Sequence, residues 1–149
     1  MFGWTLPTAP RPKFAEEILG KLTARQKVTL WRDAFFSPLH VGILADILIE
    51  LSQMEVSGVL NVGAREPISK AEFGRLIADV FGLDYRFVEE SSVRDSELRA
   101  VRPGNVGLDV KKVTKLLGPM PTVESGVFQL YDEAFDGTAE KIRGRNTYP

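Results

Sequence analysis

FFSPLHVGILADILIELSQMEVSGVLNVGAREPISKAEFGRLIADVFG, residues 35–82, decides the fold, because it predicts a helix, a buried strand and a second helix in that order. Residues 41–52 carry apolar side chains over a surface wider than the stripe of a helix that lies against one partner. We therefore expect this helix to be covered on more than one side. The run GVLNVG, residues 58–63, is too short for a helix and suits a parallel strand buried on both faces.

The helix that follows has the clearest local signals of the sequence. Ser69 stands three residues before Glu72, which is the spacing of a capping box, and apolar residues then recur at helical intervals. Gly82 stands where a left-handed C-terminal cap belongs. The pattern predicts a helix over residues 70–81. The loop 64–68 lies at the carboxyl end of the predicted strand, where open α/β sheets bind ligands, although its length is also that of an ordinary connection.

The composition indicates one globular domain. The chain has 149 residues, of which 44% are hydrophobic and 26% are charged. Its formal net charge of -1 provides no basic field, which argues against nucleic-acid and anionic-membrane binding. No cysteine and a single histidine exclude a disulfide framework and a thiolate or all-histidine zinc site. Without an apolar run of membrane-spanning length or a signal-peptide pattern, the sequence predicts a cytoplasmic protein.

The rest of the chain predicts further elements around this centre. Residues 5–13 hold three prolines and predict an irregular arm. The other expected elements are a helix over 13–23, strands over 28–31 and 85–89, a short helix from Ser91 or Ser92 to 98, a helix over 110–117 capped by Asp109, and a helix to 135 capped by Thr122. We expect residues 1–136 to form the folded unit and residues 137–149 a loose tail. His40 is expected to be a first-turn helix residue with a satisfied hydrogen bond, because no second histidine, cysteine or nearby serine completes a catalytic set.

The best ligand signal in the residues themselves is Arg102. A guanidinium next to the Pro103–Gly104 turn, the backbone amides and the side-chain amide of Asn105 is a suitable receptor for phosphate oxygens. The pattern RPGN alone is weak, because charged loop residues are often structural.

Several segments together resemble a known family. They are GW near the N-terminus, LWRDAFFSP, HVGILADIL, GVLNVG, SKAEFGRLIADVFG and VRPGNVGLDVKKVTKLLG. In this order, over about residues 2–130, they resemble the carboxyl-terminal part of extended short-chain dehydrogenases/reductases. The most similar branch is the dTDP-4-dehydrorhamnose reductase group of the NAD-dependent epimerase/dehydratase superfamily.

This resemblance implies both a fold and a ligand class. The fold is α/β and helix-rich with a small, mainly parallel sheet, and the substrates are nucleotide sugars. Arg102 is expected to face the phosphates of the nucleotide. Four further residues are expected to shape or border the pocket for the sugar nucleotide: Trp4, Phe14, Trp31 and Asp33.

Two features that the family uses for catalysis are missing from the sequence. It contains no G-x-x-G-x-x-G turn for a dinucleotide, and none of Tyr85, Tyr131 and Tyr148 has a lysine four residues later. Hydride transfer needs a bound nicotinamide beside an acid. We therefore expect a truncated fold that lacks the amino-terminal dinucleotide-binding half, has no catalytic residue and binds neither NAD nor NADP alone.

These points favour the substrate-binding portion of an NAD(P)-dependent nucleotide-sugar reductase or epimerase, catalytically incomplete by itself. Two alternatives remain open, a non-catalytic interaction module and a non-functional gene fragment. The uncovered apolar surfaces predict a homodimer or a companion chain that supplies the missing half. The contact is expected at the strand edge 59–62 or on the face formed by Ile43, Leu44, Ile47 and Leu51.

Overall fold

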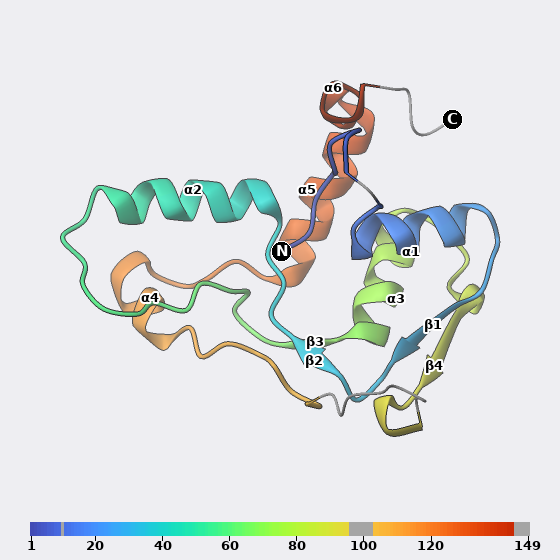
Figure 1. Cartoon of the computed structure of the whole chain (residues 1–149), viewed down its shortest axis with the longest axis horizontal. Helices are drawn as coiled ribbons and strands as arrows, with labels where there is room; N and C mark the ends of the chain where they lie inside the picture. Colours follow the sequence, from blue (N-terminus) through green and yellow to red (C-terminus); the bar gives the residue numbers. More distant parts are fainter. Residues whose placement is uncertain (10, 96–102, 145–149) are drawn as a thin grey trace.

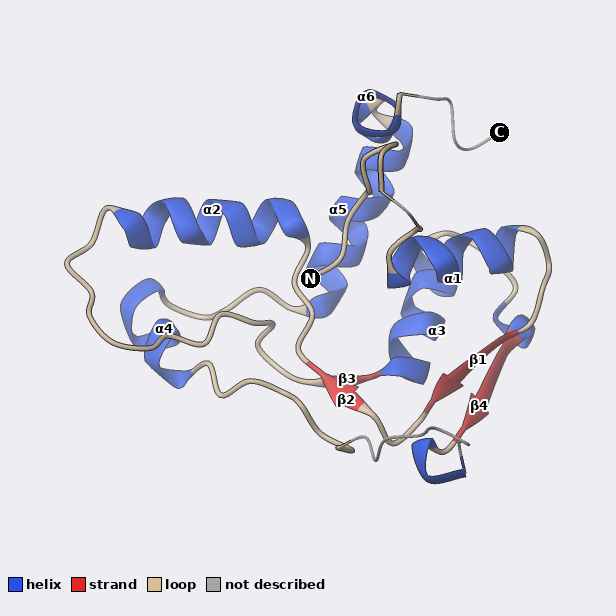
Figure 2. Cartoon of the chain, viewed as in Figure 1, coloured by secondary structure: helices blue, strands red, loops and turns tan. Residues whose placement is uncertain are grey.

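The computed structural model describes residues 1–9, 11–95 and 103–144 and is rich in helices (Figures 1 and 2). The order of its elements is α1 (Phe14–Thr23), β1 (Val28–Trp31), β2 (Phe35–Phe36), α2 (Val41–Ser52), β3 (Ile68–Ser69), α3 (Lys70–Val80), the 3-10 helix η1 (Tyr85–Phe87), β4 (Val88–Ser91), the 3-10 helix η2 (Val93–Asp95), α4 (Lys111–Leu117), α5 (Val123–Phe135) and α6 (Thr138–Arg143).

The strands form two short ladders. β1 and β4 run parallel, with Val28 opposite Val88 and Trp31 opposite Ser91. β2 and β3 are antiparallel, and Phe35 also makes a parallel bridge to Asn105. Helices make the long connection that two parallel strands require, because α2 and α3 both lie between β1 and β4 in the sequence. The predicted helix-rich α/β fold with a small, mainly parallel sheet is confirmed.

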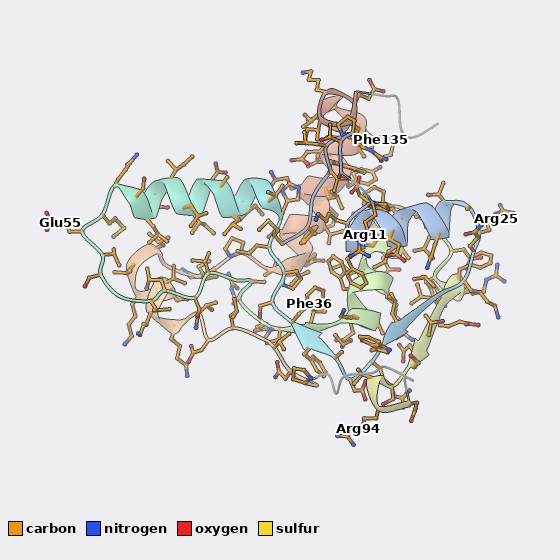
Figure 3. The ribbon with its side chains drawn as sticks, viewed as in Figure 1. Arg11, Arg25, Phe36, Glu55, Arg94 and Phe135 are labelled. Atoms are coloured by element: carbon orange, nitrogen blue, oxygen red, sulfur yellow. The ribbon has the colours of Figure 1, made fainter. Side chains whose placement is uncertain are left out.

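Helix α3 is the centre of the core and forms as its sequence predicts. Ser69 Oγ accepts a hydrogen bond from Glu72 N at 3.1 Å, and Glu72 Oε2 accepts one from Ser69 N at 2.9 Å, which completes the capping box. Gly82, just beyond the helix, has a φ of 63°. The helix packs against α1, α5 and β1, and Phe73 and Ile77 are fully buried. Figure 3 shows Phe36 of β2 reaching toward this core.

Helix α2 has the predicted bounds but not the predicted environment. It extends away from the rest of the fold, and Glu55 marks the tip of the loop that follows it (Figures 1 and 3). Ile47 is buried, whereas Leu48 and Ile49 are 52% and 59% exposed. The expectation of cover on more than one side is therefore wrong for the described part of this chain.

The predicted strand within residues 58–63 is also wrong, because residues 59–62 form an extended loop without ladder bonds. A strand needs neighbours for its N–H and C=O groups, and in the structure β1 pairs with β4 instead. Val59 is 78% exposed. The loop is held by other contacts, such as the bond from Asn61 Nδ2 to Asp109 O at 3.2 Å.

Smaller differences concern where elements begin. The edge strand predicted from residue 85 begins only at Val88, after η1. Val110 rather than Asp109 is the N-cap of α4, yet Asp109 Oδ1 still accepts a hydrogen bond from Lys111 N at 3.0 Å. Of the short helix predicted to residue 98, η2 is present, and residues 96–98 lie outside the described residues.

The predicted loose tail is corrected by α6. Thr138–Arg143 form a helix that packs against α5, and Ala139 is fully buried. Lys141 and Arg143 stand in the last turn of this helix, where a cation is stabilised by the helix dipole. Residues 145–149 lie outside the described residues, and the division of the chain at residue 136 stays a prediction.

Candidate functional site

The loop that carries the strongest ligand signal is fixed by β2. Phe35 N donates a hydrogen bond to Gly104 O at 2.7 Å, and Val106 N donates one to Phe35 O at 3.0 Å. A Cβ on Gly104 would lie 3.1 Å from Asp33 O, so the loop approaches β2 closely at this glycine. Arg102 lies outside the described residues, and its phosphate-binding role stays a prediction.

Asn105 is exposed beside β2, and its side chain serves its own loop. Its Oδ1 accepts a hydrogen bond from Gly107 N at 2.7 Å. The donors that a phosphate oxygen needs belong to the other end of the side chain, at Nδ2. The oxygen of Asn105 therefore has a role in the turn, and the substrate-binding role of this residue stays a prediction.

Asp33 joins the carboxyl ends of β1 and β4. Its carboxylate accepts hydrogen bonds from Ser92 Oγ and, at 2.7 Å, from Val93 N. These bonds, that from Ser92 first, hold the pKa of Asp33 below its ordinary value. Asp33 thus fixes the segment that follows β4, and its predicted place at the border of a substrate pocket stays a prediction.

Phe14 and Trp31 come together around a lysine that the sequence analysis did not select. Lys70 Nζ lies 4.9 Å from the centroid of the Phe14 ring and 5.0 Å from that of the Trp31 ring. Lys70 N also donates a hydrogen bond to Ala34 O at 3.1 Å, which ties the start of α3 to the segment between β1 and β2. We call Lys70, Phe14 and Trp31 the Lys70 cluster.

The position of Lys70 in the sequence could have indicated that this residue has a special role. It is the first residue of α3, directly after the N-cap Ser69. The N-terminus of a helix carries partial positive charge, which disfavours a cation and favours an anion. A lysine at this place costs stability in isolation, and the two aromatic rings offset that cost through cation–π contacts.

Trp4 lies in a different part of the fold. It belongs to the N-terminal segment, is buried, and lines a pocket of about 380 Å³ with, among others, Phe2, Leu6 and Val41. Aromatic rings connect the two regions, because Phe73 contacts Phe2 at 5.2 Å and Phe14 at 5.9 Å between ring centroids. The structure therefore places the predicted residues in two neighbouring regions.

His40 confirms its expected structural role. It is fully buried as the N-cap of α2, where Nδ1 accepts a hydrogen bond from Gly42 N at 3.3 Å. Its Nε2 lies 3.2 Å from Glu133 Oε2 of α5. Burial lowers the pKa of His40, and the nearby Glu133 carboxylate opposes this shift.

Acidification is therefore expected to destabilise the fold through His40. The unfolded state takes up the proton first, near pH 6.5, so stability from neutral His40 is present above that pH and is lost as the pH falls. The melting temperature should fall between pH 7.5 and pH 5.5, and it should fall further in Glu133→Gln, which removes the charge that favours protonation. In His40→Asn, whose side chain can still cap the helix, most of this decrease should vanish; an unchanged decrease would contradict the assignment to His40.

The described residues lack a metal-binding cluster and a membrane-spanning helix. They contain no group of three or more His, Asp or Glu side chains that could hold a metal ion. No helix among them is long and apolar enough to span a bilayer.

Comparison with known proteins gives consistent results. The profile of the family described as RmlD substrate binding domain matches residues 2–135. A probable low-salt glycan biosynthesis reductase of Haloferax volcanii is 31% identical over 118 residues, which are 78% of this chain and 39% of the relative.

Solved structures show the same fold. The dTDP-4-dehydrorhamnose reductase of Bacillus anthracis, in complex with NADP, superposes with a TM-score of 0.73 at 20% identity, over 87% of this chain and 46% of that chain. The dTDP-glucose 4,6-dehydratase of the same organism, in complex with NAD, gives a TM-score of 0.65 at 15% identity, over 93% and 44%. The chain thus spans less than half the length of these relatives.

Proposed function

The chain belongs to the RmlD substrate binding domain family, and from this premise we propose that it binds a nucleotide sugar as the substrate-binding portion of an NAD(P)-dependent reductase or epimerase. The observation that carries the proposal is the Lys70 cluster beside the loop that begins at Pro103. The cluster lies where β1 ends, and the carboxyl ends of parallel strands are where α/β folds bind ligands.

The chemistry of the cluster suits a nucleoside diphosphate. An ammonium is a compact charge for phosphate oxygens, and aromatic rings present faces on which a base or sugar ring can pack. We propose Arg102 as the second cation for the phosphates. It directly precedes, in the sequence, the loop that Phe35 holds. Trp4 is proposed to take part in binding from the neighbouring apolar pocket, which the contacting rings of Phe2, Phe73 and Phe14 connect to the Lys70 cluster.

Turnover is not expected from this chain alone. Its sequence has no Gly-rich dinucleotide turn and no Tyr-x-x-x-Lys pair, so we propose that NAD or NADP binds to a different polypeptide segment of the working enzyme. Purified chain with NADH or NADPH and dTDP-4-dehydrorhamnose should show no oxidation of the cofactor above the rate without protein. Cofactor oxidation that co-purifies with the chain and scales with its concentration would contradict the proposed incompleteness.

We further propose that the chain associates with a second copy through α2. The four residues expected at this contact are buried or partly buried against their own chain, namely Ile43, Leu44, Ile47 and Leu51. The large exposed apolar side chains on α2 are instead Val41, Leu48 and Ile49, of which Leu48 and Ile49 are more than half exposed, and Val59 is exposed in the loop that follows. An apolar face of this kind on a monomer marks an interface.

Sedimentation equilibrium of the full chain tests this association. Wild type should form a dimer at tens of micromolar, and Leu48→Glu with Ile49→Glu should shift it to monomer, because buried carboxylates in an apolar contact are costly. Glu50→Gln, on the same helix, is the matched control and should remain a dimer. A wild-type monomer throughout this range would refute self-association and favour a companion chain.

The cytoplasmic location stays a prediction that cell fractionation can test.

A further inference from the structure

Helix α6 lies outside the part of the chain that the family profile matches, yet it contacts the N-terminal arm. We define the arm as residues 2–9, which precede α1. We propose that α6 is a latch that holds this arm in place, and that Arg143 and Glu16 are the positioning residues through which it acts. The inference does not depend on the proposed ligand.

Glu16 is the point where three segments meet. Its side chain is buried in the first turn of α1, where Oε2 accepts a hydrogen bond from Thr5 Oγ1 at 2.6 Å and from Lys13 N at 3.2 Å. Arg143 Nη1 of α6 lies 3.6 Å from the other oxygen, Oε1. A buried carboxylate is stable only when it is paired and hydrogen-bonded, so the arm, α1 and α6 each supply part of what Glu16 needs.

Arg143 also contacts the arm directly. Its guanidinium carbon lies 5.9 Å from the centroid of the Trp4 ring. This distance is that of a weak cation–π contact, which adds to the ion pair with Glu16. One side chain of α6 therefore reaches both Glu16 and the arm.

Other residues of α6 pack against the fold and keep Arg143 within reach of Glu16 and Trp4. Ala139 is fully buried, and Ile142 packs against the hydrophobic core. At the end of the helix, a Cβ on Gly144 would lie 3.8 Å from Pro7 Cγ of the arm. Figure 1 shows α6 next to the turn of the arm, at the end of α5.

The consequence concerns the apolar pocket of about 380 Å³. Its lining includes Phe2, Trp4, Leu6, Thr8 and Ala9 of the arm, with Val41 from α2. Because most of the wall belongs to the arm, the pocket keeps its shape only while the arm is held. Release of α6 is therefore expected to open this pocket without unfolding the core around Phe73.

Amide hydrogen exchange of the full-length chain tests the latch. In Arg143→Gln, the amides of Ala9 and Lys13, which are bonded to Leu6 O and Glu16 Oε2, should exchange at least tenfold faster. Amides in the middle of α3 should keep their wild-type rates. Arg143→Lys should restore most of the protection, because it returns a cation near Glu16. Lys141→Gln, exposed on the same helix, should change nothing.

Ala139→Asp tests the same inference without touching the ion pair. A carboxylate at this buried contact should undock α6 from α5 and accelerate exchange at the amides of Ala9 and Lys13. In a Trp31→Phe background, acrylamide should then quench the fluorescence of Trp4 severalfold more strongly than in the Trp31→Phe parent. Unchanged exchange in both Arg143→Gln and Ala139→Asp would overturn the proposal. Equal acceleration in the arm and in α3 would overturn it too, because it would show global destabilisation.

Discussion

Phe73→Ala should destabilise the chain severely. Phe73 is fully buried near the start of α3, and its ring contacts those of Phe2, Phe14 and Phe36, with centroid distances of 5.2, 5.9 and 5.5 Å. Removal of a buried phenylalanine costs about 3–5 kcal/mol, because apolar contact is lost and a cavity remains. A domain of this size has a total stability of about 5–15 kcal/mol, so the loss is a large share of it.

Urea denaturation followed by circular dichroism measures this loss. Phe128→Ala is the matched control, because it removes the same side chain from a site on α5 that is 51% exposed. The control should change the free energy of unfolding by less than about 0.5 kcal/mol. Similar midpoints for the two variants would contradict the central position of Phe73.

Lys70→Gln should weaken nucleotide binding by tenfold or more. The substitution keeps the length of the side chain roughly but removes the charge that lies between Phe14 and Trp31. A hydrogen bond to a charged group contributes about 1.5–3 kcal/mol, which corresponds to a factor of ten or more in the dissociation constant. Titration with dTDP, followed through tryptophan fluorescence, gives this constant.

The control for this variant separates a specific contact from the general charge of the protein. Lys115→Gln makes the same change on α4, where the lysine is exposed. It should bind dTDP like the wild type. Circular dichroism of Lys70→Gln should show a folded protein, so that weaker binding does not reflect unfolding. Equal affinity of Lys70→Gln and Lys115→Gln would exclude the Lys70 cluster as the phosphate site.

Local signals allowed the correct prediction of most helices. Ser69 with Glu72, and Thr122, satisfy the first N–H groups of α3 and α5 through bonds that span three residues. Such bonds form between neighbours in sequence, so they can be recognised without knowledge of the fold. The apolar spacing that follows each cap then identifies the buried face.

The environment of the segment 41–63 could not be predicted in this way. Its apolar residues indicate burial, but burial of Leu48, Ile49 and Val59 requires a partner that the described part of the chain does not provide. An apolar pattern shows which face of a segment can be buried, but it does not show whether a partner surface is present. The docking of α6 could not be predicted for a similar reason, because the contact of Arg143 with Glu16 joins residues far apart in sequence.

The candidate site was predictable only in part. The family resemblance selected Phe14 and Trp31, which the structure brings together, and Asp33, whose carboxylate proves to be bound by Ser92 and Val93. Lys70 was not predicted, because it directly follows the N-cap Ser69 and takes no part in the capping box that identifies this helix start. A positive charge at a helix N-terminus is unfavourable, and this was the sequence signal that Lys70 has a role besides helix formation.

Isothermal titration calorimetry of a dTDP-sugar into the full-length wild-type chain tests the central claim most directly. The account predicts saturable binding with one site per chain, competition by dTDP, and no comparable heat from NADPH. Absence of saturable heat for the dTDP-sugar at millimolar concentration, in protein shown to be folded by circular dichroism, would contradict the claim that this chain binds nucleotide sugars.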